Sequence, residues 1–81
     1  MTEQELNYWN MTFPTSPLQL GTKVKVNPNN EYYEDWKGEF VISGISLNAF
    51  HKINITIAPN LQAVGCHHSD GWSVYDLRAV N

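Results

Sequence analysis

Residues 53–57 alternate isoleucine with a short polar residue, in the order Ile-Asn-Ile-Thr-Ile. Successive side chains of a strand point to opposite faces of a sheet, so an apolar residue at every second position is typical of a strand with one face on a core. Pro59 and a polar stretch bound the run. This segment therefore predicts a strand at residues 52–58 and places the chain in a mainly β class.

The rest of the chain after Gly21 also consists of short strand-like runs separated by turn residues. We expect strands at residues 23–26, 38–45, 52–58, 72–74 and 78–80, a further short strand at 61–64, and a single helical turn at 75–77. Gly44 lies inside the second of these strands and predicts a bulge or a sharp bend. Four to five short, bent strands favour a small closed barrel, because closure removes exposed sheet edges.

The N-terminal segment has the features of a short helix over residues 2–13. Thr2 and Glu5 have the spacing of a capping box, in which each side chain satisfies the other residue's free backbone N–H. Pro14 and Pro17 end the helix, because proline removes a backbone donor.

One face of this helix carries an apolar stripe made by Leu6, Trp9 and Phe13. Tyr8 lies off the stripe, so we expect it to be exposed. A helix this short is marginal alone in water and needs a surface on which to dock. Two alternatives stay open: the stripe packs on the chain's own sheet, or it docks on a partner or on a second copy, which would give a dimer through the helix.

A resemblance to known barrels rests on two runs and on the end of the chain. Residues 21–26 (Gly-Thr-Lys-Val-Lys-Val) and 36–42 (Trp-Lys-Gly-Glu-Phe-Val-Ile) resemble the opening strands of SH3-like barrels of the KOW type. With the pair Tyr32-Tyr33, the chain also looks like the photosystem I subunit IV group. Residues 72–80 are similar to the strand, turn and strand that close such barrels.

The resemblance covers about residues 20–80 and implies a small SH3-like barrel of four to five short antiparallel strands. Residues 1–20 would then form the helix and a proline-containing connector, and residues 21–81 the barrel. A chain of 81 residues is enough for one such domain and too short for two.

Composition narrows the class of protein further. Cys66 is the single cysteine, so the chain cannot close an internal disulfide. The first residues are acidic where a secretory signal is basic, and no run approaches the roughly 18–20 apolar residues of a membrane span. We therefore expect a soluble, acidic, cytoplasmic protein with a net charge of −3.

The sequence Cys66-His67-His68-Ser69-Asp70 is the one cluster that suggests metal or nucleophile chemistry. Zinc ligands typically come in pairs separated by two to five residues, so that they converge on the ion. Adjacent residues in an extended loop point in different directions, and no third group is evident to orient a Cys–His pair. We therefore expect no metal, no cofactor and no enzymatic activity.

The loop between the first two strands is the better candidate site. Tyr and Trp are enriched at binding hot spots, and an acidic pair favours a basic partner. In SH3-like barrels this loop borders a peptide-binding groove, and the end of the fourth strand lies nearby. The predicted partner-binding residues are Tyr32, Tyr33, Glu34, Asp35, Trp36, Trp72 and Tyr75. The alternative is that Tyr33, Trp36 and Trp72 simply complete a thin core.

Together these features predict a non-enzymatic protein–protein interaction module. The role expected is that of a small accessory or regulatory protein, including one encoded by a phage or mobile element. The alternative is a nucleic-acid- or ribosome-associated KOW-like module. In that case Lys23, Lys25 and Lys37 would contact phosphates while an aromatic residue of the loop stacks on bases.

Overall fold

The structure is a computed structural model that describes residues 2–60, 62 and 68–80. Its elements in chain order are the helix α1 (Thr2–Thr12), β1 (Lys23–Val26), the short 3-10 helix η1 (Tyr33–Asp35), β2 (Phe40–Leu47), β3 (Ile53–Ala58), β4 (Ser69–Trp72) and β5 (Leu77–Ala79). The chain is mainly β, with five antiparallel strands in one sheet and one short N-terminal helix.

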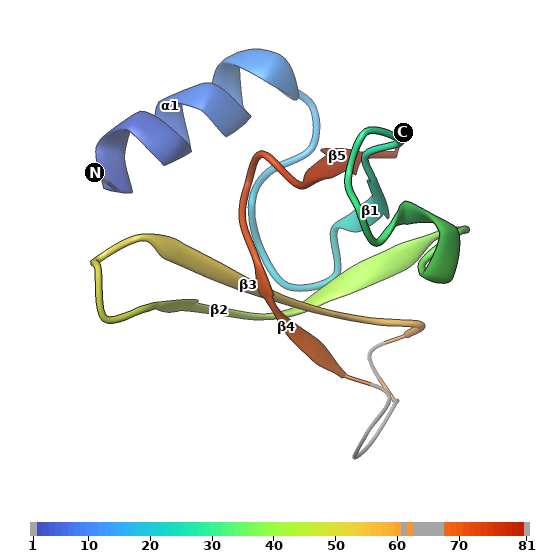
Figure 1. Ribbon diagram of the computed structural model, residues 1–81. Helices are drawn as coiled ribbons and strands as arrows, with labels where there is room; N and C mark the ends of the chain where they lie inside the picture. The colour runs from blue at the N-terminus through green and yellow to red at the C-terminus, as the bar shows by residue number, and fades with distance from the viewer. Residues whose placement is uncertain (1, 61, 63–67, 81) are drawn as a thin grey trace.

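The strands lie in the order β4-β3-β2-β1-β5, so the chain's last strand pairs with its first (Figure 1). β2 and β3 form the longest hairpin, with pairs running from Val41↔Ala58 to Leu47↔Ile53. β1 pairs with β2 only through Lys23↔Val41 and Val24↔Phe40. The sheet is therefore a long hairpin with shorter strands attached on either side.

The alternation seen in the sequence sets which side chains reach the core. In β3, Ile53, Ile55 and Ile57 are buried, while Asn54 and Thr56 are only half-buried. The fully buried side chains come from four strands, the helix and the β4–β5 turn, and the largest are Trp9, Ile42, Ile55, Ile57, Leu77, Val24, Val26 and Val74. The strand predicted from the Ile-Asn-Ile-Thr-Ile run is thus confirmed.

The bulge predicted at Gly44 is also confirmed. The register of β2 against β3 shifts between Ile42 and Gly44, so that Ser43 is the extra residue. A Cβ at Gly44 would lie 3.3 Å from Thr56 Cβ, which is tighter than ordinary contact. The absence of a side chain therefore lets β3 approach closely at the bend.

Several strand boundaries differ from expectation. β5 is Leu77–Ala79 instead of residues 78–80, so Leu77 belongs to a strand and not to the helical turn expected at 75–77. β2 begins at Phe40 and continues to Leu47, and β4 is Ser69–Trp72 instead of residues 72–74. The chain leaves the sheet after Trp72 because the Asp76 carboxylate accepts a hydrogen bond from Ser73 N–H at 2.9 Å. Such local side-chain bonds compete with a strand ladder. The expected strand at 61–64 lies outside the described residues.

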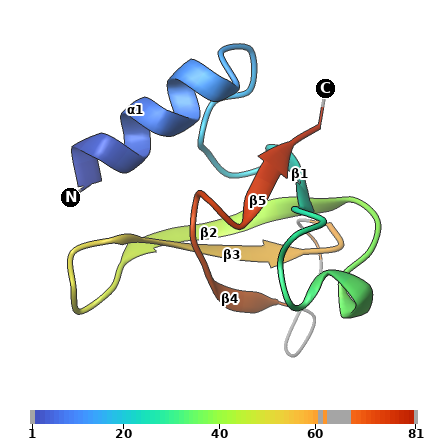
Figure 2. The same ribbon diagram turned by 45° about the horizontal axis from the view of Figure 1, so that its top comes forward.

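The helix is found where it was predicted, and it packs on the chain's own core. Trp9 is fully buried, its indole Nε1–H donates to the Ser16 carbonyl at 2.8 Å, and its ring lies 4.7 Å from that of Phe13. Figure 2 shows α1 lying across the sheet from the hairpin end towards β5. No helix among the described residues has the length and apolarity to cross a membrane.

The buried face of the helix differs from the predicted stripe. Leu6 is 39% exposed, whereas Glu5 is buried, and Tyr8 packs against the core where we expected it to be exposed. The rotation follows from the polar contacts of the first turn, which connect it to the β2–β3 hairpin.

The expected capping box is wrong. Thr2 Oγ1 donates to the His51 carbonyl at 2.8 Å, and Glu5 Oε2 accepts a hydrogen bond from Ile53 N–H at 2.8 Å. Both side chains therefore reach the hairpin instead of each other's backbone. The Ile53 N–H is a buried strand donor that needs a partner, and Glu5 supplies it.

Candidate functional site

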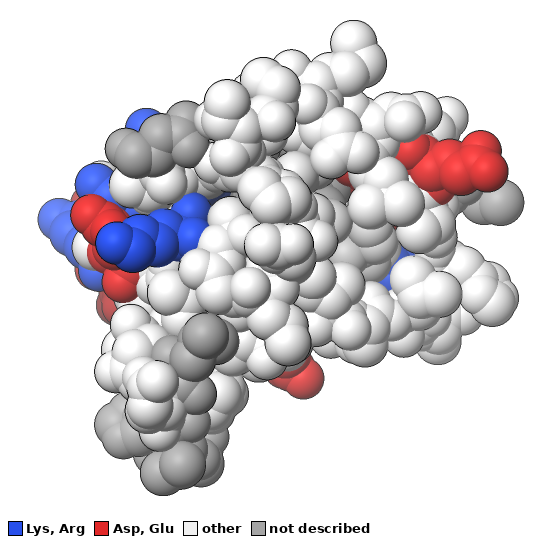
Figure 3. Space-filling view, turned by 180° about the vertical axis from the view of Figure 1, so that it is seen from behind, with Lys and Arg blue, Asp and Glu red and all other residues white. Residues whose placement is uncertain are grey.

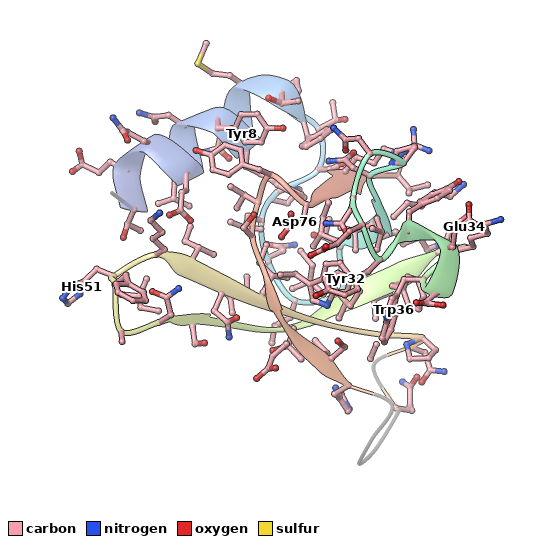
Figure 4. The ribbon with its side chains drawn as sticks, in the orientation of Figure 1. Tyr8, Tyr32, Glu34, Trp36, His51 and Asp76 are labelled. Carbon is pink, nitrogen blue, oxygen red and sulfur yellow. The ribbon has the colours of Figure 1, made fainter. Side chains whose placement is uncertain are left out.

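A groove of about 430 Å³ lies between the β1–β2 loop and strand β4. Three aromatic residues line it: Tyr32 and Trp36 from the loop, and Trp72 from the end of β4. Figure 4 shows Tyr32 and Trp36 side by side on the flank of the molecule where the loop approaches β4. We refer to this hollow as the aromatic groove; the other lining residues are Asn30, Glu31, Ser69, Asp70, Gly71 and Asp76.

The three rings contact one another at steep angles around Trp72. Tyr32 and Trp36 have ring centroids 6.4 Å and 5.7 Å from that of Trp72, with interplanar angles of 80° and 74°. Edge-to-face packing of this kind is the favoured arrangement of aromatic pairs. Trp72 is 6% exposed and Tyr32 is 54% exposed. Trp72 therefore forms the floor of the groove, and Tyr32 is its most accessible ring.

Asparagine side chains fix the loop that carries Tyr32. Asn27 Nδ2 donates to the Tyr75 carbonyl at 2.8 Å, and Asn30 Nδ2 donates to Asp76 Oδ1 at 3.1 Å. Asn30 Oδ1 also accepts a hydrogen bond from Tyr32 N–H at 2.8 Å, which is an Asx turn. The sequence marks these asparagines only as turn residues, and their cross-chain partners become visible only in the fold.

The groove has an acidic character. The described residues that line it include the carboxylates of Glu31, Asp70 and Asp76 and no Lys or Arg. Asp76 is already engaged by Asn30 and Ser73, whereas Glu31 and Asp70 are exposed. A hollow lined by one sign of charge attracts ligands of the opposite sign.

Three of the seven predicted site residues, Tyr32, Trp36 and Trp72, thus come together in the groove. Trp72 serves the core and the groove at once. Trp36 is half-buried and packs against the core, with its ring 5.4 Å from that of Phe40. Both tryptophans therefore pack with the core and also line the groove.

The other loop residues lie outside the groove. Tyr33 packs against the core, and the Lys37 ammonium lies 5.9 Å from the centre of its ring. Glu34 forms an exposed ion pair with the same lysine at 2.9 Å and points outward in Figure 4. Asp35 is exposed and does not line the groove. The exposed acidic groups at the groove are therefore Glu31 and Asp70, neither of which the sequence predicted as a partner-binding residue.

Tyr75 lies at a second hollow, between α1 and residues 71–75. This hollow has a volume of about 480 Å³ and shares Gly71 and Trp72 with the aromatic groove. The Tyr75 ring lies 4.7 Å from that of Tyr8, so the tyrosine covers the helix instead of facing Tyr32. It is still 53% exposed.

The Cys–His cluster is only partly described. Cys66 and His67 lie outside the described residues, and His68 Nδ1 is 2.9 Å from Ser43 Oγ at the β2 bulge. Among the described residues, no three His, Cys, Asp or Glu side chains are grouped so that they could hold a metal ion.

Three of the five basic residues, Lys23, Lys25 and Arg78, lie on the paired strands β1 and β5. Lys25 faces Arg78 across the two strands, and Lys23 lies on the same face of β1 because it is two residues away. Figure 3 shows Lys and Arg side chains concentrated at this end, interspersed with acidic ones.

No protein-family model, curated protein or solved structure matches this chain.

Proposed function

We propose that the chain is a non-enzymatic protein-interaction module whose aromatic groove binds a basic segment of a partner protein. The observation that carries this proposal is the combination of an exposed ring, two half-buried or buried indoles and free carboxylates in one hollow. In this role the protein acts as an accessory or regulatory subunit of its partner.

The chemistry of the groove favours an arginine or lysine side chain as the anchor. Cationic groups are attracted to aromatic rings, and the attraction strengthens where water is displaced. Glu31 and Asp70 add charge complementarity, which speeds encounter and disfavours acidic competitors. Because Trp36 and Trp72 are held by core contacts, the groove is formed before binding and loses little entropy on binding.

An SH3-like barrel is part of the same proposal. It is supported by the position of β1 between β2 and β5, and by the long loop between β1 and β2 that borders the groove. In proteins of that class, which the sequence resembles, such a groove binds peptides.

A titration with an oligo-arginine peptide tests the groove, with tryptophan fluorescence as the signal because two of the three tryptophans line it. We expect Glu31→Gln and Asp70→Asn each to weaken binding several-fold, and more strongly at low salt than at high salt. Glu39→Gln is the matched control, since it removes the same charge at an exposed position outside the groove. Equal weakening by all three variants would show only non-specific attraction to an acidic protein and would refute the proposal.

A nucleic-acid-binding module is the second candidate, and the basic cluster on β1 and β5 favours it. Lys23, Lys25 and Arg78 could neutralise phosphates, and Tyr33 beside Lys37 could stack on a base. The aromatic groove itself would not take part, because its carboxylates repel phosphates.

Gel shifts with single- and double-stranded DNA and RNA separate the two candidates. Binding by the second candidate must weaken steeply with salt and fall on Lys25→Ala, whereas Glu31→Gln should leave it unchanged or strengthen it. Absence of any shift at low salt would eliminate this candidate.

A further inference from the structure

On its β1 side, the hairpin end of strand β2 is a sheet edge that no other strand of the described residues pairs with. β1 pairs with β2 only at Phe40 and Val41, and the residues just before β1 add two bonds, from Gly21 N–H to the Ile42 carbonyl and from Ile42 N–H to the Thr22 carbonyl. Beyond Ile42, none of the described strands pairs with this side of β2. Figure 2 shows the hairpin extending well past β1.

The hydrogen-bond pattern determines which backbone groups face this edge. Asn48 N–H donates to the Lys52 carbonyl at 2.9 Å, so residues 48 and 52 bond to each other. Antiparallel pairs alternate between bonding to each other and bonding outward, and the next pair, Leu47↔Ile53, must therefore bond outward. The bond from Ile53 N–H to Glu5 on the far side agrees with this phase. Two residues further along, the same alternation turns the backbone N–H and C=O of Ile45 to the open edge.

The side chains at this edge are apolar and accessible. Ile45 and Leu47 are opposite the buried Ile55 and Ile53, so they lie on the core side of the sheet, yet they are 41% and 57% exposed. Residues 43–47 (Ser-Gly-Ile-Ser-Leu) contain no charge and no proline. Monomeric proteins usually protect a free edge with a charge, a proline, a bulge or a covering element. The bulge at Ser43 lies before residues 45–47, which themselves contain neither a charge nor a proline. In Figure 3 the side of the molecule that carries the hairpin end shows white surface, with acidic side chains above it and a basic side chain beside it.

We propose that this edge pairs with the same edge of a second copy, antiparallel about a two-fold axis through Ser46. The register places Ile45 opposite Leu47 of the second copy, and Leu47 opposite its Ile45. These are the residues whose backbone groups point outward, so each of the two pairs can exchange two hydrogen bonds. The Ile-Ser-Leu segment is symmetric in polarity about its serine, as a self-complementary two-fold contact requires.

Charge and geometry both permit this pairing. Each copy carries a net charge of −3, but the paired segments carry none, so like charges do not meet at the contact. The axis stands perpendicular to the sheet and therefore keeps the core side of both copies on the same side. The product is one continuous sheet with both α1 helices on the same face. Because few residues pair, we expect association at high protein concentration.

Sedimentation of the full chain from micromolar to millimolar concentration tests the proposal. We expect the mass to rise from 9.3 kDa towards twice that value. Leu47→Lys should keep the protein at the mass of one chain throughout, because it places two like charges at the contact. Met11→Lys is the matched control, because Met11 is 83% exposed and lies near the end of α1 that is remote from the hairpin. This variant should associate like the wild type.

Amide hydrogen exchange provides a measurement that needs no variant. The amides of Ile45 and Leu47 should exchange slowly in concentrated solution and rapidly in dilute solution, while the amide of Ile55 stays protected in both. A wild-type mass of one chain at every concentration would overturn the proposal. So would association that Met11→Lys abolishes as fully as Leu47→Lys does, or exchange at Ile45 and Leu47 that is independent of concentration.

Discussion

The side chain of Glu5, on the helix, completes the hydrogen bonding of a strand that is distant in sequence. It is 4% exposed on the helix, and its carboxylate oxygen accepts the Ile53 N–H at the point where β4 no longer accompanies β3. The carboxylate thus takes the place of the backbone acceptor that β4 would provide if it continued beside Ile53. An acidic residue in the first turn also suits the positive end of the helix dipole.

Removing this acceptor should destabilise the fold. We expect Glu5→Ala to lower the free energy of unfolding by about 1–3 kcal/mol, because a buried donor is left without a partner. Glu5→Gln keeps an acceptor oxygen and should lose less than half as much. Glu3→Ala, at an exposed position in the same turn, is the control for the helix dipole. Urea unfolding followed by circular dichroism measures all three, and an equal loss for Glu3→Ala and Glu5→Ala would contradict the role assigned to Glu5.

Among the elements, α1 depends most on tertiary contacts. It has 11 residues, which is too few for a stable helix alone in water, and it is held by Trp9 in the core and by Thr2 and Glu5 on the hairpin. Its docking in turn covers core residues of the sheet. Helix and sheet should therefore unfold in one transition.

A proline in the middle of α1 tests this coupling. Asn7 is exposed, so Asn7→Pro should act through the backbone alone and lower the free energy of unfolding by about 3 kcal/mol. Asn7→Ala is the matched control and should be neutral or slightly stabilising. The melting of the sheet, followed by the fluorescence of Trp36 and Trp72 in a Trp9→Phe background because Trp9 lies on the helix, should shift with the helix signal. A sheet transition that stays in place would show that the helix is an independent appendage.

In the molecule as a whole, the aromatic groove joins two segments that are far apart in the chain. Tyr32 and Trp36 follow β1, Trp72 ends β4, and Asn30 and Asp76 join the two segments by a hydrogen bond. The rings of Trp72 and Tyr32 therefore differ in how much they contribute to the stability of the fold. Trp72 belongs to the core cluster, whereas Tyr32 contacts it only from the outside.

Two alanine variants separate binding from folding at this groove. Tyr32→Ala should change the stability by only about 1 kcal/mol, the value of one exposed aromatic contact, but should weaken binding of the basic peptide strongly. Trp72→Ala should lower the stability by about 3–5 kcal/mol and abolish binding with it. Thermal melts and peptide titrations are run on the same samples. If Tyr32→Ala bound the peptide with wild-type affinity, the aromatic groove would not be the binding site.

The strands, the helix and the bulge could be predicted from the sequence because their causes are local. Alternation in β3, proline after the helix and glycine in β2 act over a few neighbouring residues. The loop rings Tyr32 and Trp36 were found for a similar reason, since aromatic residues in a turn-rich stretch stand out. The exact ends of β2 and β4 were not predictable, because the bonds of Asp76 and Asn48 that shape them depend on the turns already being formed.

The hydrogen-bond partners of polar side chains could not be predicted from neighbouring residues in the sequence. Thr2 and Glu5 have capping-box spacing, yet each bonds a residue of the β2–β3 hairpin, and the acidic groups at the groove are Glu31 and Asp70 instead of Glu34 and Asp35. The order of apolar and polar residues is enough to select strands, because burial acts on each side chain separately. Which hydrogen bonds form, and which rings and charges face one another, depends on distances that exist only once the strands have paired.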